Sequence, residues 1–385
     1  MNPPKRLSRR SLLLLGAGAL AVAGTAAAHT AVRDSDVPEV LDPMPGAAPS
    51  RQDRLKVKPV SHWTALYQKS WDFQYREGLP LSRSADSRDH YDLAYDIDSL
   101  VAMFRATDQR RYLDRALTFT ENVVAVAKPS ASLPRSGFGD RYQGWASSKS
   151  GEGGDEVPLY ESYFWRYGTT LLTAIRDSPG VWGDAGYRAR YDRLLGFAET
   201  DIFEKWFTRG ADDNIYRERT HMAAHWALIA LNLSRLTGDA GRKSRYSTVH
   251  DTIANRLRAQ LRRNPAEPTA YFWSDVWDSA KRPGQDVGHG NGVIAYVVEA
   301  RDRGSAWTDA DMAAFAALLT KVAWPGGTTY RAYVDGTGTD NGWFADGFVK
   351  LGRYDPAVQL RLEKHRVVND QFVANMALNA RVLRA

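Results

Sequence analysis

The chain has 385 residues, of which 51 are lysine or arginine, 45 are aspartate or glutamate and none is cysteine. Four of the basic residues and none of the acidic ones lie in residues 1–28, so the remainder carries a formal charge of only +2. This balance excludes recognition of nucleic acid through a general basic surface, and an anionic ligand must instead be bound by a local cluster. The lack of cysteine excludes a disulfide framework and a thiol-linked lipid anchor.

Residues 1–28 have the pattern of an export signal. A basic start is followed by an apolar run from Leu12 to Val22 and by Ala26-Ala27-Ala28, which is typical of a cleavage site. The run from Ser8 to Leu12 resembles a twin-arginine signal, and an ordinary secretory signal is the alternative. Both predict a secreted protein, extracellular or periplasmic. The apolar run is too short and too rich in glycine for a membrane anchor.

Residues 29–52 are rich in proline, alanine and aspartate, which predicts a flexible lead-in. No low-complexity break follows, so we expect residues 53–385 to form a single domain.

Two kinds of helical pattern follow along the chain. Residues 241–263 repeat apolar side chains every three or four positions and carry arginine elsewhere, as an amphipathic helix does. Residues 221–236 are apolar nearly all round, as expected of a helix surrounded by protein. Each buried-type stretch is followed by an amphipathic one, and the predicted pairs are 90–105 with 110–126, 159–175 with 186–206, 221–236 with 241–263, and 289–301 with 308–323.

These pairs predict an all-α fold, an (α/α) toroid with an inner ring of buried helices and an outer ring of amphipathic ones. Further hairpins expected in 53–77 and 341–384 bring the number to about six, with a buried helix starting near 341. An open α-solenoid is the alternative. The runs 270–273 and 328–331 have strand-like composition and predict short β-hairpin loops at the mouth of the toroid.

Polar and aromatic clusters stand at the starts of the buried-type stretches. They are Asp89–Asp92, Leu159–Glu161, Arg219–His221 and Gly288–Asn291. Aromatic residues also gather in the loops, where their faces can stack on pyranose rings while amides and carboxylates bind hydroxyl groups. Trp145 and Trp343, each preceded by glycine in a polar loop, are expected to face a ligand.

Two histidines are candidates for chemistry. His221 and His225 are spaced to share one helix face, but a zinc-protease motif needs glutamate where Met222 stands, so no metal site is expected. His225, beside Trp226, is interpreted as a packed histidine, whereas His221 at the helix start is expected to reach the cavity. His289 follows Asp286, which can orient the imidazole or cap the helix.

At these histidines the chain resembles toroidal polysaccharide lyases, particularly the alginate and glucuronan lyase groups. Arg219-Thr220-His221 and Gln285–His289 are similar to two elements of that family. The chain departs from the pattern at Gln285, where an arginine is common, and at Thr220, where an amide is expected.

The resemblance implies β-elimination at a uronate of an acidic polysaccharide or oligosaccharide. A base removes the C5 proton, the carboxylate is neutralised, and an acid protonates the departing oxygen. The expected catalytic residues are His221, His289, Tyr216 and Arg219. No cofactor is expected. The expected substrate-binding residues are Gln143, Trp145, Tyr160, Glu161, Arg282, Asp286, Asn291, Tyr333 and Trp343.

Other functions fit the same pattern. A glycoside hydrolase needs two carboxylic acids across a cleft, and the available residues are Asp92, Asp96, Glu161, Asp286 and Asp340. A non-catalytic carbohydrate-binding protein needs the aromatic residues but neither histidine. A uronate epimerase begins with the same proton abstraction as a lyase.

Overall fold

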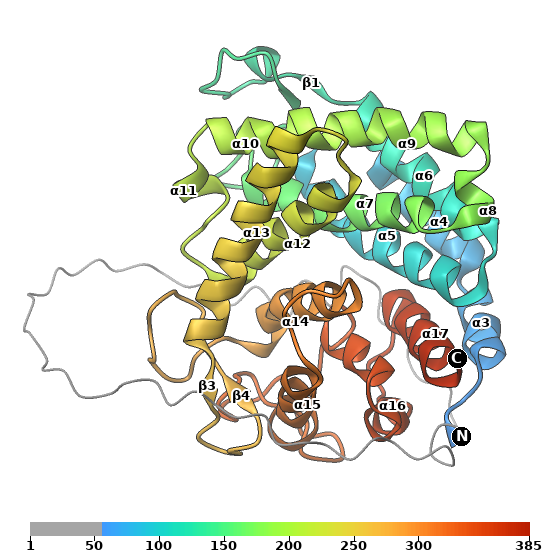
Figure 1. The fold of residues 1–385 in the computed structure, drawn as a ribbon, viewed down its shortest axis with the longest axis vertical. Coiled ribbons are helices and arrows are strands. Elements are labelled where there is room, and N and C mark those ends of the chain that lie inside the picture. The colour runs from blue at the N-terminus through green and yellow to red at the C-terminus, as the bar shows by residue number, and fades with distance from the viewer. Residues whose placement is uncertain (1–55) are drawn as a thin grey trace, which may run out of the picture. The chain divides into compact units, whose positions relative to one another are not determined.

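The helices in the computed structural model confirm the all-α prediction (Figure 1). The structure describes residues 56–385, and the predicted export signal and lead-in lie outside this range. Within the described residues, no helix has the length and apolar character needed to cross a membrane.

Most helices follow one another with short connections, but long ones precede α7, α14 and η4. In chain order they are α3 Val60–Gln68, α4 Trp71–Ser82, α5 Ser87–Thr107, α6 Arg110–Ala125, η1 Ser130–Ser132, α7 Pro158–Arg176, α8 Pro179–Trp182, α9 Ala185–Phe197, η2 Ala198–Glu204, α10 Lys205–Thr208, α11 Ala211–Asn214, α12 Thr220–Leu236, α13 Ala240–Gln260, α14 Val287–Asp302, α15 Asp309–Ala317, η3 Leu318–Ala323, η4 Phe348–Arg353, α16 Pro356–Leu362 and α17 Asp370–Arg384. The segments η2 and η3 are π-helical, and η1 and η4 are 3₁₀-helical.

The predicted buried-type stretches are α5, α7, α12 and α14, and most of their side chains are buried. Each of them packs against the next along the chain, from α5 to α7, from α7 to α12 and from α12 to α14. The contacts continue from α14 to η4, from η4 to α17 and from α17 back to α5. Figure 1 shows α3 and α17, from opposite ends of the described chain, side by side.

The amphipathic helices cover these buried ones. Helix α6 packs on α5, α9 on α7 and α13 on α12. Acidic side chains begin several helices, because their oxygens accept hydrogen bonds from backbone N–H groups that the first helical turn leaves unpaired. Asp86 accepts from Arg88 N at the start of α5, and Asp239 accepts from Arg242 N at the start of α13.

The strand predictions hold only in part. Strand β4 (Tyr271–Phe272) lies in the first predicted run and pairs antiparallel with β3 (Arg262–Arg263). The second run forms no named strand, only one bridge between Gly326 and Thr329. A further hairpin, not predicted, joins β1 (Lys128–Pro129) to β2 (Gln143–Gly144).

The prediction of a buried helix starting near residue 341 is wrong. The chain from 341 to 347 is irregular, and helical structure begins with η4 at Phe348. The reason is a close backbone approach to α14, where a Cβ atom on Gly347 would lie 2.1 Å from the carbonyl oxygen of Asn291. The side-chain oxygen of Asn291 accepts from the N–H groups of Gly347 and Phe348 at 3.0 and 3.1 Å, so these groups bond to α14 instead of to a helix of their own.

Candidate functional site

Five rings from the four buried helices α5, α7, α12 and α14 form a continuous row. The ring centroids lie 4.5 Å apart between His289 and His221, 6.4 Å between His221 and His225, 5.0 Å between His225 and Tyr163, and 5.6 Å between Tyr163 and Tyr95. We call these five residues the ring row. Its two ends, His289 and Tyr95, are the most exposed members.

His289 is held by Asp286 at the start of α14. The carboxylate of Asp286 accepts from the backbone N–H of His289 at 2.8 Å and contacts Nδ1 of the ring at 2.9 Å. This hydrogen bond, aided by the negative charge, raises the pKa of His289. Burial acts to raise the pKa of Asp286 as well, but the bonds and charge of His289 outweigh it, and the pKa of Asp286 is lowered. Asp286 thus both caps α14 and orients the imidazole of His289. The sequence had suggested these two roles as alternatives.

His221 has the opposite electrostatic environment. Its exposed fraction is 8%, and burial, together with the neighbouring His289, lowers its pKa to about 3. Within residues 56–385 its Nδ1 atom has no hydrogen-bond partner. The ring is therefore neutral at ordinary pH, and this nitrogen is enclosed by protein.

The segment before α14 fixes the two histidines relative to each other. Thr220, at the start of α12, donates from its N–H to the carbonyl of Asp275 at 2.8 Å and from its hydroxyl to Oε1 of Gln285 at 3.0 Å. Gln285 in turn donates from its N–H to the carbonyl of Trp273 at 3.0 Å. Thr220 and Gln285, the two departures from the lyase pattern, therefore bond to each other.

Arg219 lies beside the pair, on the rim. Its guanidinium forms an ion pair with Asp275, and its side chain keeps 44% of its surface exposed. Asp275 also acts to raise the pKa of His289, whereas Arg219 acts to lower it. Two residues before Arg219, Arg217 has a positive φ of 29°, an unfavourable backbone conformation, and its carbonyl accepts from Trp277 Nε1 at 2.7 Å.

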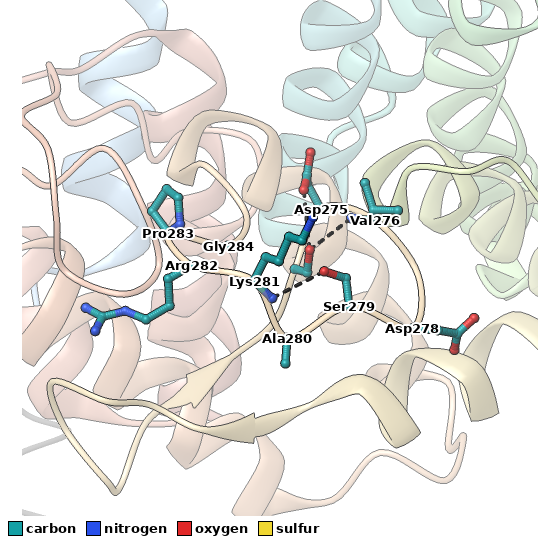
Figure 2. Close-up of a pocket in the computed structure, with 10 residues that line it drawn as sticks. Asp275, Val276, Asp278, Ser279, Ala280, Lys281, Arg282, Pro283 and Gly284 are labelled. Carbon is teal, nitrogen blue, oxygen red and sulfur yellow. Dashed lines mark hydrogen bonds between the residues drawn. The ribbon is translucent and has the colours of Figure 1, made fainter. Parts of the chain in front are cut away.

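A pocket of about 570 Å³ opens next to this rim (Figure 2). It is lined by residues 274–276 and 278–284, which lie between β4 and α14, and Asp275 is one of them. The Arg282 side chain extends away from Asp275 and Asp278 (Figure 2), and its Nε atom donates to Asp335 at 2.9 Å. The predicted role of Arg282 in binding a carboxylate therefore competes with an ion pair that it already forms.

Four predicted substrate-binding residues, Trp145, Glu161, Asn291 and Tyr160, are buried instead. Trp145 is 1% exposed, donates from Nε1 to the carbonyl of Val123 at 3.0 Å and packs edge-on against His90. Glu161 is 2% exposed and forms an ion pair with Lys205 at 2.8 Å. Burial, the largest effect, raises its pKa to about 7. Asn291 is fully buried and uses both ends of its amide to hold the segment 343–348.

Tyr160 and the remaining predicted residues do not gather around the two histidines. Tyr160 is buried, with its hydroxyl bonded to Glu152 at 2.6 Å, and Gln143 is exposed and uses its backbone to bond Asp201. Tyr333 is half-buried and forms a β-bridge with Asp286. Trp343 is half-buried, with its ring 5.9 Å from that of Tyr95. Tyr216 packs against the core and makes no ring contact with either histidine in the described chain.

The sequence analysis missed the inner end of the site. Tyr95, Tyr163, Arg166 and Asp346 meet there, with the Nη2 atom of Arg166 3.0 and 2.8 Å from the two carboxylate oxygens of Asp346. The only available signal was spacing, since Tyr163 follows Tyr160 by three residues and Tyr95 follows Tyr91 by four, one helical turn further inward in each case. His225 also lies in the ring row, although it is 2% exposed, as expected of a packed histidine.

Within residues 56–385, no three or more histidine and carboxylate groups are arranged to hold a metal ion. Comparison of the chain with protein-family models, with curated proteins and with solved structures gave no match in any of the three.

Proposed function

We propose that this protein is an exported polysaccharide lyase that cleaves a uronate-containing polysaccharide by β-elimination. The observation that carries the proposal is the pair His221 and His289, 4.5 Å apart, with opposite pKa shifts and an aspartate on only one of them. Pairs of titratable groups whose environments separate their pKa values are typical of acid–base sites. Export rests on the pattern of residues 1–28.

We also propose that the helices form an (α/α) toroid. The supporting observation is that helix contacts run from α5 through α7, α12, α14, η4 and α17 and return to α5. In such an arrangement the starts of α5, α7, α12 and α14 gather at one mouth, as a long polymer requires.

The roles of the two histidines follow from their surroundings. His221, neutral at ordinary pH, is the base that removes the proton at C5. Its low pKa makes it a weak base in the empty site, but the negative charge of a bound uronate raises the pKa of a nearby imidazole. His289, more readily protonated because of Asp286, and Arg219 supply positive charge next to the uronate carboxylate, which favours the enolate-like intermediate.

The hydrolase alternative has less support. Of the carboxylic acids available for it, Glu161 is enclosed with Lys205, and Asp286 is bound to His289. A binding protein without catalysis needs no histidine pair of this kind.

The decisive experiment is incubation of the purified protein with a panel of acidic and neutral polysaccharides. We expect the ultraviolet absorbance of an unsaturated uronate to appear with an acidic polymer. The matched control is the double variant His221→Ala with His289→Ala, which should produce none. New reducing ends without this absorbance would instead establish hydrolysis. The absence of both signals on every polymer would refute the proposal that the protein is an enzyme of this kind.

A further inference from the structure

Residues 274–284, which supply the lining of the pocket, form a closed loop before α14. The two ends of the loop meet, because the N–H of Gln285 donates to the carbonyl of Trp273 at 3.0 Å. Gly284 permits this closure: its φ is 80°, and a Cβ atom there would lie 2.6 Å from the carbonyl oxygen of Trp273. Compact surface loops whose ends lie together in this way frequently carry function. The backbone therefore holds the pocket at a fixed place beside the start of α14.

Four charged residues line this pocket, and three of them already have a partner of opposite charge. The three ion pairs are Asp275 with Arg219, Asp278 with Arg256, and Arg282 with Asp335. The fourth charged residue is Lys281, which is exposed and forms no ion pair in the part of the chain that the structure describes. The pocket therefore offers one uncompensated positive charge, and a bound anion would complete the pairing.

Asp275 connects the pocket to the two histidines. Its backbone carbonyl accepts from the N–H of Thr220, the residue before His221, at 2.8 Å. Its carboxylate acts to raise the pKa of His289. Figure 2 shows the Lys281 side chain extending toward Asp275. A polymer whose reacting unit lies at the histidines therefore has its neighbouring unit beside this pocket and within reach of Lys281.

We propose that the pocket binds the uronate next to the one that reacts, and that the ammonium group of Lys281 pairs with the carboxylate of this neighbour. The inference rests on the proposed lyase function and deepens it, because it makes two consecutive uronates the preferred substrate. The volume of about 570 Å³ is that of a small-molecule site and accommodates one sugar. Arg219 remains available for the carboxylate of the reacting unit, so two cations serve two adjacent carboxylates. A neutral neighbour gains nothing from Lys281, and this difference in binding is the source of the preference.

The test compares lysine variants on two forms of one polymer. Lys281→Gln removes the charge, and Lys281→Arg retains it. Lys243→Gln is the matched control, because Lys243 is an exposed lysine on α13 that does not line the pocket. The first form is the acidic polymer that the unmodified protein cleaves. The second is the same polymer with a measured fraction of its carboxylates reduced to alcohols, so that many of its uronates have neutral neighbours.

At low salt we expect Lys281→Gln to raise KM for the acidic polymer by about three- to fivefold, the scale of one exposed ion pair, with kcat unchanged. Added sodium chloride should shrink this difference, because salt screens charges at the surface. The difference should also shrink on the partly reduced polymer. Lys281→Arg and Lys243→Gln should stay close to the unmodified protein on both forms.

An equal rise of KM in Lys243→Gln, or a rise in Lys281→Gln that is as large on the partly reduced polymer as on the intact one, would overturn the inference. A fall in kcat without a change in KM would overturn it as well. Thermal unfolding of each variant separates a lost ion pair from a misfolded protein, and Lys281→Arg shows whether the charge alone restores KM. If the unmodified protein forms no unsaturated product, the lyase function itself fails; if it does and Lys281→Gln retains its KM, only this inference fails.

Discussion

His221 and His289 are the same type of residue, but their surroundings shift their pKa values in opposite directions. The two rings are neighbours, yet burial lowers the pKa of one and a bound carboxylate raises the pKa of the other. At ordinary pH the pair therefore holds a neutral base next to a group that readily carries charge.

Replacing either histidine should abolish most of the turnover. We expect His221→Ala and His289→Ala each to lower kcat by about a hundredfold or more, because each removes a group that takes part in proton transfer or charge stabilisation. His225→Ala should act chiefly on stability. Steady-state kinetics together with thermal unfolding measure both effects, and near-normal turnover in both of the first two variants would contradict the site.

Asp286 should control the charge of His289. In Asp286→Asn the amide still caps α14, but the negative charge is gone, so the pKa of His289 should fall toward its ordinary value near 6.5. The fraction of His289 that is protonated at pH 7 then decreases. NMR titration of the imidazole measures the change, with Asp278→Asn, which lies on the exposed Arg256 ion pair, as the control. An unchanged pKa would show that Asp286 does not hold the charge.

At the scale of elements, the sequence located the helices but not which loop residues they enclose. Periodicity placed α5, α7, α12, α13 and α14 within a few residues of their observed ends. Trp145 was assigned to the surface because its neighbours are polar and Gly144 precedes it. The structure shows why that signal fails: a Cβ atom on Gly144 would lie 2.7 Å from the Nζ atom of Lys205, so the glycine permits a close approach to a buried charge.

Ion pairs between residues far apart in the chain could not be predicted from the sequence either. Glu161 and Lys205 are 44 residues apart, and Arg166 and Asp346 are 180 apart. No local pattern marks either pair, whereas Asp286 and His289, three residues apart at a helix start, were recognised from the sequence.

The two tryptophans should now behave differently. Trp145→Ala should lower the free energy of unfolding by about 3–5 kcal/mol, because a large side chain is removed from the core. Trp343→Ala, at a half-buried position beside Tyr95, should instead weaken oligosaccharide binding with a smaller loss of stability. Denaturant unfolding and binding calorimetry distinguish the two, and similar stability losses in both variants would place Trp343 in the core as well.

At the scale of the whole molecule, buried neutral histidines should make the protein sensitive to acid. Burial lowers the pKa of His90 and of His365 to about 4, whereas an unfolded chain has histidines near 6.5. Between these values the unfolded chain binds protons that the folded protein does not, so stability falls as the pH drops from about 6.5 to 4. For His90 this amounts to about 3 kcal/mol, since one pKa unit corresponds to ~1.4 kcal/mol.

The measurement is the free energy of unfolding in denaturant as a function of pH, for the unmodified protein and for His90→Gln. In the variant, the number of protons taken up on unfolding between pH 6.5 and 4 should be smaller by about one. Other titrating groups such as Glu161 cancel in the comparison. An identical pH dependence in the two proteins would show that the pKa of His90 is the same in the folded and unfolded states.

The segment from Asp275 to Gln285 is bonded at both of its ends to the start of α12, through Thr220. Between these two anchors, Val276 forms a β-bridge with Arg219 and Trp277 donates to the carbonyl of Arg217, whereas residues 278–284 line the pocket. Residues 278–283 are thus the part of the chain where insertions and substitutions can accumulate while the reacting groups keep their separation. Substrate preference can therefore change through this segment while the arrangement of His221 and His289 stays the same.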